Sequence, residues 1–433
     1  MRVMKWSMIA LAVAAGTSQF AMASSQDESK GFVEDSSFGL KFRTLYMNRD
    51  FKNGASNNQS TPNKTRIKGY REETGLSGTA IFESGYTQGT IGVGVDAMGL
   101  GMIKLDSGPG RTGNAMFAKN AEGEPEDSQG KGGAAIKFRL SDTTLKYGRQ
   151  FVASPVFATD DSRLLPEVAE GTLITSKEIK GLELTAGRFT ALSSQTGMGK
   201  DSINGKSTPG LTSANIAGAT YQFTDNFVAG IAASDVDDYF KKQYINANYT
   251  LPIDDNQSLN FDLNAYRTKD QGQALYGELD NKLWSLAAAY SLGAHKFTLA
   301  YQQSSGDTNY LYGVDGNSTI FVSNSIQISD FIGVDEKSWQ GRYDLNMKEY
   351  GVPGLSFMAR YVYGDNIETS SGSEGKEHEF NFETKYVLQE GPAKDLSFRL
   401  RSAIYRANSA YNADYSNDLN DVRLIVEYPL SIL

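Results

Sequence analysis

The chain has 433 residues, with 42 basic and 51 acidic side chains and a net charge of −9. This acidic balance argues against nucleic acid as a partner. Mean hydropathy is −0.41, and no segment after the N-terminal region has ~18 uninterrupted apolar residues, so the sequence excludes helical membrane spans. Cysteine is absent, which excludes disulfides and thiolate metal sites.

Residues 1–23 match a secretory signal peptide. Arg2 and Lys5 precede an apolar core, and Ala21-Met22-Ala23 provides a small-residue cleavage site. The apolar core is well short of the ~20 residues that span a bilayer, so an uncleaved anchor is not expected. We therefore expect export, cleavage after Ala23 and a single mature domain of residues 24–433.

Long polar segments alternate with short turns along the mature chain. The long segments fall near 52–70, 104–133, 151–170, 191–216, 233–241, 267–281, 304–337, 364–377 and 406–420. The short turns fall near 84–88, 141–144, 177–181, 224–226, 252–257, 291–295, 348–354 and 390–395. These connections separate about eighteen strands, and the sorting of long loops and short turns to opposite sides is typical of outer-membrane barrels. The sequence predicts an all-β fold, a transmembrane antiparallel β-barrel.

The strands between these connections alternate apolar and polar residues. In 396–405, Leu396, Phe398 and Leu400 lie on one face of an extended chain, while Arg399 and Arg401 lie on the other. The same alternation recurs in 38–46, 136–140, 355–363 and 422–432. A strand that is apolar on one side and basic on the other suits a barrel wall between lipid and an aqueous lumen.

Several motifs resemble those of one known family, over essentially the whole mature chain. They are Gly31-Phe32-Val33-Glu34-Asp35, Tyr46-Met47-Asn48-Arg49-Asp50-Phe51, Asp161-Ser162-Arg163-Leu164-Leu165-Pro166, Gly187-Arg188-Phe189, Ser338-Trp339-Gln340-Gly341-Arg342-Tyr343-Asp344, Val352-Pro353-Gly354-Leu355 with Arg360-Tyr361, and Asp421-Val422-Arg423-Leu424-Ile425-Val426-Glu427-Tyr428-Pro429-Leu430. In this order they resemble the OprD family of outer-membrane carboxylate channels. The resemblance implies an eighteen-stranded barrel, a monomer or loose homotrimer, with inward-folded loops and a ladder of basic side chains.

The resemblance also assigns the pore constriction. It places one inward loop at Phe151–Glu170, where Asp160, Asp161 and Ser162 face the solute, and a second inward loop around Asp330. On the opposite wall, the matching basic positions are Arg399, Arg401 and Arg423, and the ladder would continue through Arg43, Arg139 and Arg360. Ile425 stands where some relatives carry a second arginine, so the narrow preference of one branch for basic amino acids is not transferred.

The arginine pattern also has a direct physical meaning. Arginines two apart on one strand stand roughly 6.5–7 Å from each other, and two like charges at this spacing favour an anion passing between them. The expected solutes are small organic acids or amino acids. The arginines could instead only neutralise luminal carboxylates such as Glu427, because buried charges usually have partners.

Two other functions stay open at this level. A barrel hydrolase would need His295 or His378 beside a serine, and an adhesin-like barrel would have a plugged lumen. No cofactor or metal is expected, since Gly92-Val93-Gly94 is followed by no helix and Asp235–Asp238 lacks a complete calcium-loop pattern. The remaining expected partners are outer-membrane lipids and the barrel assembly machinery.

Overall fold

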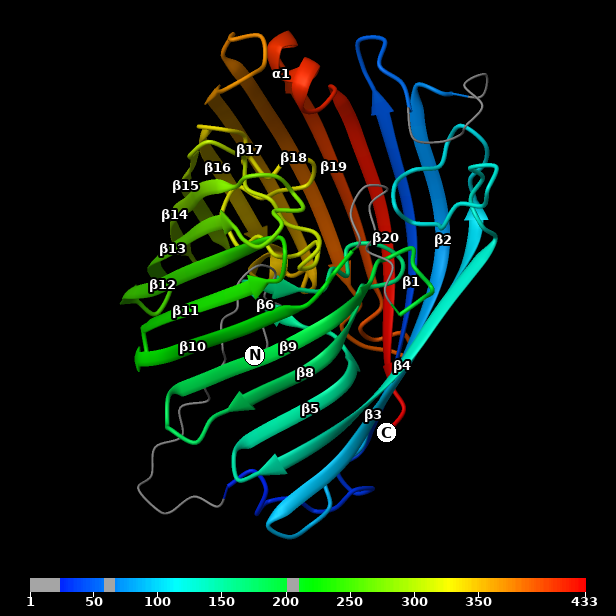
Figure 1. The fold of residues 1–433 in the computed structure, drawn as a ribbon, viewed down its shortest axis with the longest axis vertical. Coiled ribbons are helices and arrows are strands. Elements are labelled where there is room, and N and C mark those ends of the chain that lie inside the picture. The colour runs from blue at the N-terminus through cyan, green and yellow to red at the C-terminus, as the bar shows by residue number, and fades with distance from the viewer. Residues whose placement is uncertain (1–23, 58–66, 201–209) are drawn as a thin grey trace.

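The computed structural model describes residues 24–57, 67–200 and 210–433 (Figure 1). The predicted signal peptide, residues 1–23, lies outside these ranges. The helical segments within them are short, namely η2 (Met347–Tyr350) and α1 (Ser409–Asp414). Across the three described ranges, no helix has the length and apolar character needed to cross a membrane.

Eighteen strands form one antiparallel sheet. The first nine are β1 (Ser37–Phe51), β2 (Tyr70–Glu83), β3 (Ile91–Asp106), β4 (Ser128–Leu140), β5 (Thr143–Gln150), β8 (Val168–Ser176), β9 (Leu182–Ser193), β10 (Ala214–Thr224) and β11 (Phe227–Val236). The other nine are β12 (Phe240–Asp254), β13 (Gln257–Asp270), β14 (Asp280–Leu292), β15 (His295–Ser305), β16 (Lys337–Asn346), β17 (Leu355–Ile367), β18 (Gly375–Val387), β19 (Ser397–Ala407) and β20 (Leu419–Ser431).

The sheet closes on itself through its first and last strands. The blue β1 lies beside the red β20 in Figure 1, and their register runs from Gly39↔Ser431 to Phe51↔Leu419. Closure leaves no strand edge, so the backbone N–H and C=O groups are satisfied between strands, as the bilayer interior requires. The predicted eighteen-stranded antiparallel barrel is confirmed.

One predicted long segment, 233–241, is wrong. β11 continues to Val236 and β12 begins at Phe240, so the connection is only residues 237–239. The run Asp235–Asp238 looks like a loop because of its polar composition. Near the extracellular end, however, outward-facing strand positions lie outside the hydrocarbon and accept charges, so polarity there does not end a strand.

The two faces of the wall follow the predicted alternation. On β20, Val422 and Leu424 are 38% and 43% exposed, whereas Asp421 and Arg423 are 0% and 5% exposed. The outward side chains are exposed because they would contact lipid. The inward side chains are covered because loops fold into the barrel behind them.

Two long loops fill much of the lumen. We call residues 151–167 L3 and residues 306–336 L7; L3 contains the hairpin of β6 (Ala153–Ser154) and β7 (Phe157–Ala158), and the yellow L7 lies inside the barrel in Figure 1. Their apolar side chains pack against β8–β14, where Phe157 and Tyr310 have no exposed surface. L3 also packs against β1 through Leu164 and Leu165, and L7 packs against β17, β19 and β20 through Ile328.

Replacing Leu424 by arginine should destabilise the barrel by roughly 2–4 kcal/mol, because the charge would face the bilayer midplane. The neighbouring Ile425 faces the lumen, so Ile425→Arg is the matched control and should cost much less. Urea unfolding in lipid vesicles measures both free energies. Equal costs for the two variants would show that the faces are assigned wrongly.

Candidate functional site: the luminal constriction

Basic residues occupy successive inward rows at the seam of the barrel. Pairing of β1 with β20 and of β20 with β19 places the inward residues in three rows, which are Leu45↔Ile425↔Arg399, Met47↔Arg423↔Arg401 and Arg49↔Asp421↔Ala403. Arg43, paired with Glu427, lies one row nearer the periplasm. Since inward residues of one strand are roughly 6.5–7 Å apart, guanidiniums line several consecutive levels of one wall.

L3 meets this wall at Arg43. The Arg43 Nη1 atom donates to the Asp161 carbonyl at 2.9 Å and to the Asp161 Oδ1 atom at 2.8 Å, and Nε donates to Glu427 Oε1 at 2.8 Å. Lys41 Nζ adds an ion pair of 2.8 Å to Asp161. The surrounding protein partly desolvates Asp161, whose side chain keeps 44% of its surface exposed, but Arg43 and Lys41 hold the pKa of this carboxyl below its usual value. Arg43 therefore anchors the loop.

L7 meets the same wall two rows higher, at Arg423. The Arg423 Nη2 atom donates to the Gln327 carbonyl at 3.1 Å, and Gln327 Nε2 donates to Asp421 at 2.7 Å. Asp421 also accepts from Arg423 Nε at 2.7 Å and from Arg49 Nε at 2.8 Å. One carboxylate thus serves two guanidiniums and one amide of the loop.

Arg399 and Arg401 lie on β19. Arg401 pairs with Arg423, in the row where L7 docks, and Arg399 lies one row below it. The Arg399 Nη2 atom is 2.7 Å and the Arg401 Nε atom 3.2 Å from the same Glu383 Oε2 atom. Their side chains keep 11% and 20% of their surface exposed. Here too, one carboxylate is shared by two guanidiniums.

The other predicted arginines have different settings. Arg360 is buried and donates through Nε and Nη2 to Asn381 Oδ1, an uncharged partner, at 3.1 and 2.7 Å. Arg139 lies at the periplasmic end of β4, where its Nε atom donates to Gln26 at 2.9 Å and its guanidinium lies 4.1 Å from the Tyr86 ring centroid. The structure therefore places Arg139 near the periplasmic exit, apart from the rows at the seam.

The predicted polar loop residues are used mainly within the loops. Asp160 accepts from the Ser162 backbone N–H and hydroxyl at 2.7 and 2.8 Å, and from Gln195 at 2.7 Å. Asp330 accepts hydrogen bonds from the hydroxyls of Ser325 and Tyr312. Ser162 and Asp161 remain exposed, while the carboxylates of Asp160 and Asp330 hold L3 and L7 in shape.

Two arginines missing from the predicted set belong to the same constriction. Arg49 shares Asp421 with Arg423, and Arg163 of L3 donates to the Asn114 carbonyl at 2.8 Å. Burial, together with repulsion from Arg423 and Arg49, lowers the pKa of Arg163 to about 9. Both residues lie within the family motifs given above. Each comes near Arg423 only through contacts with residues that are far away in the sequence.

A cavity of ≈ 780 Å³ lies next to the L3 contact. Lys41, Thr79 and Glu83 line it from the barrel wall, and Phe151 and Asp161 line it from L3. This volume is in the range of sites for small organic molecules. Among the residues that the structure describes, no cluster of histidines and carboxylates is suited to hold a metal ion.

Comparisons with known proteins agree with this architecture. The family model described as outer membrane porin, OprD family, matches residues 30–432 of this chain. Porin D of Pseudomonas aeruginosa is 45% identical over the full length of both chains. The crystal structure of Acinetobacter baumannii OccAB1 has a TM-score of 0.88 and 35% identity, covering 95% of this chain and 100% of its own. Pseudomonas aeruginosa OpdK, solved with vanillate, has a TM-score of 0.82 and 33% identity, with 93% and 100% covered.

The junction between L3 and L7 should be sensitive to pH. Glu167 of L3 is buried and accepts from the backbone N–H groups of Asp160 and Asn317 at 2.9 and 3.0 Å. Burial outweighs these bonds and raises the pKa of Glu167 to about 7, from an ordinary value of 4.5. Glu167 thus holds its proton more tightly when L3 and L7 are docked against each other than when the two loops are apart. The docked state of the two loops should be most stable at pH values below the ordinary pKa of Glu167, and its stability should fall as the pH rises toward about 7.

Gating noise of single channels in planar bilayers measures this effect. Wild type should show more brief current fluctuations at pH 8 than at pH 5. Glu167→Gln keeps an acceptor for the same N–H groups but cannot ionise, so its noise should be independent of pH. A Glu167→Gln channel that keeps the wild-type pH response would contradict the assignment.

Proposed function

Because this chain belongs to the OprD family of outer-membrane porins, we propose that it conducts small carboxylate-containing solutes by passive, partly selective diffusion along its luminal arginines. Its relatives are porins and channels, so it is an outer-membrane channel for small solutes, and the hydrolase alternative has no support. What remains to be proposed is the chemistry that the channel selects.

The sharing of carboxylates by guanidiniums carries this proposal. Asp421 lies between Arg49 and Arg423, and Glu383 lies between Arg399 and Arg401. Each group of two cations and one anion has one positive charge in excess. The register places Arg401 opposite Arg423, so the two groups are adjacent. This arrangement supports binding of an anion, which purely structural pairing of one cation with one carboxylate would not.

The expected strength of the interaction suits transport. A carboxylate 4 Å from a guanidinium gains about 1 kcal/mol in water and about 4 kcal/mol at an effective dielectric constant near 20. A luminal site whose guanidiniums are only partly exposed lies between these limits. Such an attraction concentrates the anion and still releases it, as conduction requires.

The relative solved with vanillate supports the same solute class. Vanillate is a carboxylate anion, and OpdK shares 33% identity with this chain over the full length of OpdK and 93% of this chain. Asp161 and Ser162, exposed on L3 where the loop docks on Arg43, would meet the uncharged or cationic part of a solute. Asp330 of L7 and Arg360 of the barrel wall would also interact with the solute. Arg43 and Arg139 would interact with it at levels nearer the periplasm.

Replacing Arg399 and Arg401 together by alanine should weaken anion preference and slow benzoate uptake by roughly fivefold to tenfold, because a loss of about 1–1.4 kcal/mol corresponds to that factor. Reversal potentials in KCl gradients and liposome swelling measure the two effects. The change should shrink at high salt, since the screening length falls from ~10 Å at 0.1 M to ~3 Å at 1 M. The double variant Arg188→Ala/Arg406→Ala, which removes two outward-facing arginines, is the control. Wild-type selectivity of the Arg399/Arg401 variant at low salt would favour a purely structural role.

The complementary change is Glu383→Gln, which leaves both guanidiniums in place and removes the carboxylate that they share. The luminal charge becomes more positive by one unit, so anion preference and benzoate uptake should rise at low salt. If selectivity moved toward cations or stayed unchanged in a correctly folded channel, the shared-carboxylate proposal would fail.

A further inference from the structure

The outer wall of β12–β14 changes character sharply at one level. Above Gln257 at the periplasmic end, the outward positions of these strands are apolar or aromatic as far as Ile245, Ala265 and Trp284. Above that level the outward positions carry Lys241, Gln243, Arg267, Lys269 and Lys282. Charges first occur on this outer wall where the strands leave the hydrocarbon on the extracellular side.

Four of these side chains form one patch, which we call the outer cationic patch: Lys241, Arg267, Lys269 and Lys282. The register pairs Lys241 with Lys269 and Arg267 with Lys282 on neighbouring strands. Two outward carboxylates accompany them. Asp235 is 3.3 Å from Lys241, and Asp280 contacts Arg267 and is 3.3 Å from Lys269. The patch thus has two positive charges in excess.

The cations are accessible from the membrane side. The side chains of Lys241 and Lys269 keep 60% and 59% of their surface exposed, and that of Arg267 keeps 28%. Within the described ranges, no carboxylate lies at ion-pairing distance from Lys282. Like charges directly opposite each other on paired strands repel, so a ligand that neutralises them would stabilise this part of the wall.

Aromatic side chains mark the adjacent membrane interface. Trp284 lies 5.3 Å from Tyr301, and Tyr301 lies 4.6 Å from Trp339, measured between ring centroids on three neighbouring strands. Trp and Tyr concentrate at the level of lipid headgroups. Lys282 is the next outward residue above Trp284 on β14, so the patch begins at headgroup level.

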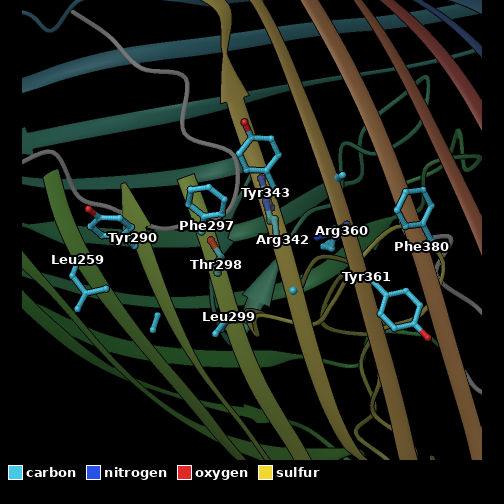
Figure 2. A pocket seen from close by; sticks show the side chains of 13 residues that line it. Leu259, Tyr290, Phe297, Thr298, Leu299, Arg342, Tyr343, Arg360, Tyr361 and Phe380 are labelled. Carbon is cyan, nitrogen blue, oxygen red and sulfur yellow. The ribbon is translucent and has the colours of Figure 1, made fainter. Parts of the chain in front are cut away.

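Nearer the periplasm, and extending sideways from β13 to β18, the barrel wall has an apolar hollow of ≈ 550 Å³ (Figure 2). Its lining includes the small residues Ala288, Gly341 and Ala359 and larger side chains such as Leu259, Tyr290, Phe297, Leu299, Tyr361 and Phe380. Leu299, Tyr361 and Phe380 of this lining are exposed on the outer face of the wall. A cationic patch at headgroup level, beside an apolar outer wall with a hollow, matches a molecule with an anionic headgroup and acyl chains.

We infer that this face of the barrel binds a phosphate-bearing glycolipid of the outer leaflet. The headgroup phosphates would contact Lys241, Arg267, Lys269 and Lys282, and the acyl chains would lie along the apolar outer wall toward the hollow. Basic clusters at a membrane surface attract anionic headgroups at short range. Free phosphate would gain the charge contacts alone, whereas the glycolipid gains both.

Native mass spectrometry of the detergent-solubilised full barrel, titrated with diphosphorylated lipid A, tests the inference. Wild type should retain lipid A with at least about tenfold higher affinity than the fourfold variant Lys241→Gln/Arg267→Gln/Lys269→Gln/Lys282→Gln, since each cation near the surface contributes to binding. The control variant Lys177→Gln/Lys180→Gln/Lys348→Gln/Lys394→Gln removes four lysines from periplasmic turns and should bind as wild type does. Single-channel conductance should be unchanged in both variants, which checks folding.

Two further arms need only the wild-type protein. Dephosphorylated lipid A should bind at least about tenfold more weakly than the diphosphorylated form, and inorganic phosphate should not displace bound lipid A at equal concentration.

Equal binding by the fourfold variant, equal binding of the two lipids, or displacement by phosphate would overturn the inference. So would a wild-type oligomer that dissociates in the fourfold variant without any change in lipid binding, because a second copy of the chain would then cover this face.

Discussion

The closed hydrogen-bonded seam between β1 and β20 is the constraint on which the rest of the structure depends. A bilayer offers no water to an unpaired backbone group, so the sheet must have no edge. Closure fixes the parity of each strand, and parity sends Leu424 outward and Arg423 inward. The same seam brings β1, β19 and β20 side by side, and thereby gathers arginines that are far apart in the sequence.

Inside the barrel, the cost of burying charge determines the arrangement. A buried guanidinium without a partner is strongly disfavoured, and L3 and L7 provide partners by docking on Arg43 and Arg423. The carboxylates on the wall are fewer than the guanidiniums that they bridge, as at Glu383 and Asp421. In our account, this imbalance lets one set of arginines both support the loops and attract anions.

Much of the fold could be predicted from local pattern, because strand parity has a period of two and turns have characteristic residues. The alternation in 396–405 and 422–432 identified the inward arginines correctly as inward. The segment 233–241 was mispredicted, because charge near the membrane edge does not distinguish a strand from a loop. The partners of Arg43 were not predictable, since Asp161 lies 118 residues away and depends on how L3 folds back. For the same reason Arg49 and Arg163 were missed, although their motifs were visible.

The most direct test of carboxylate recognition is a crystal structure of the channel with 4-bromobenzoate, located by the anomalous signal of bromine. The account predicts a bromine peak in the lumen, one ring length from a carboxylate that contacts the guanidiniums of Arg401 and Arg423. A well-ordered ligand bound in the lumen with its carboxylate away from Arg399, Arg401 and Arg423 would contradict it.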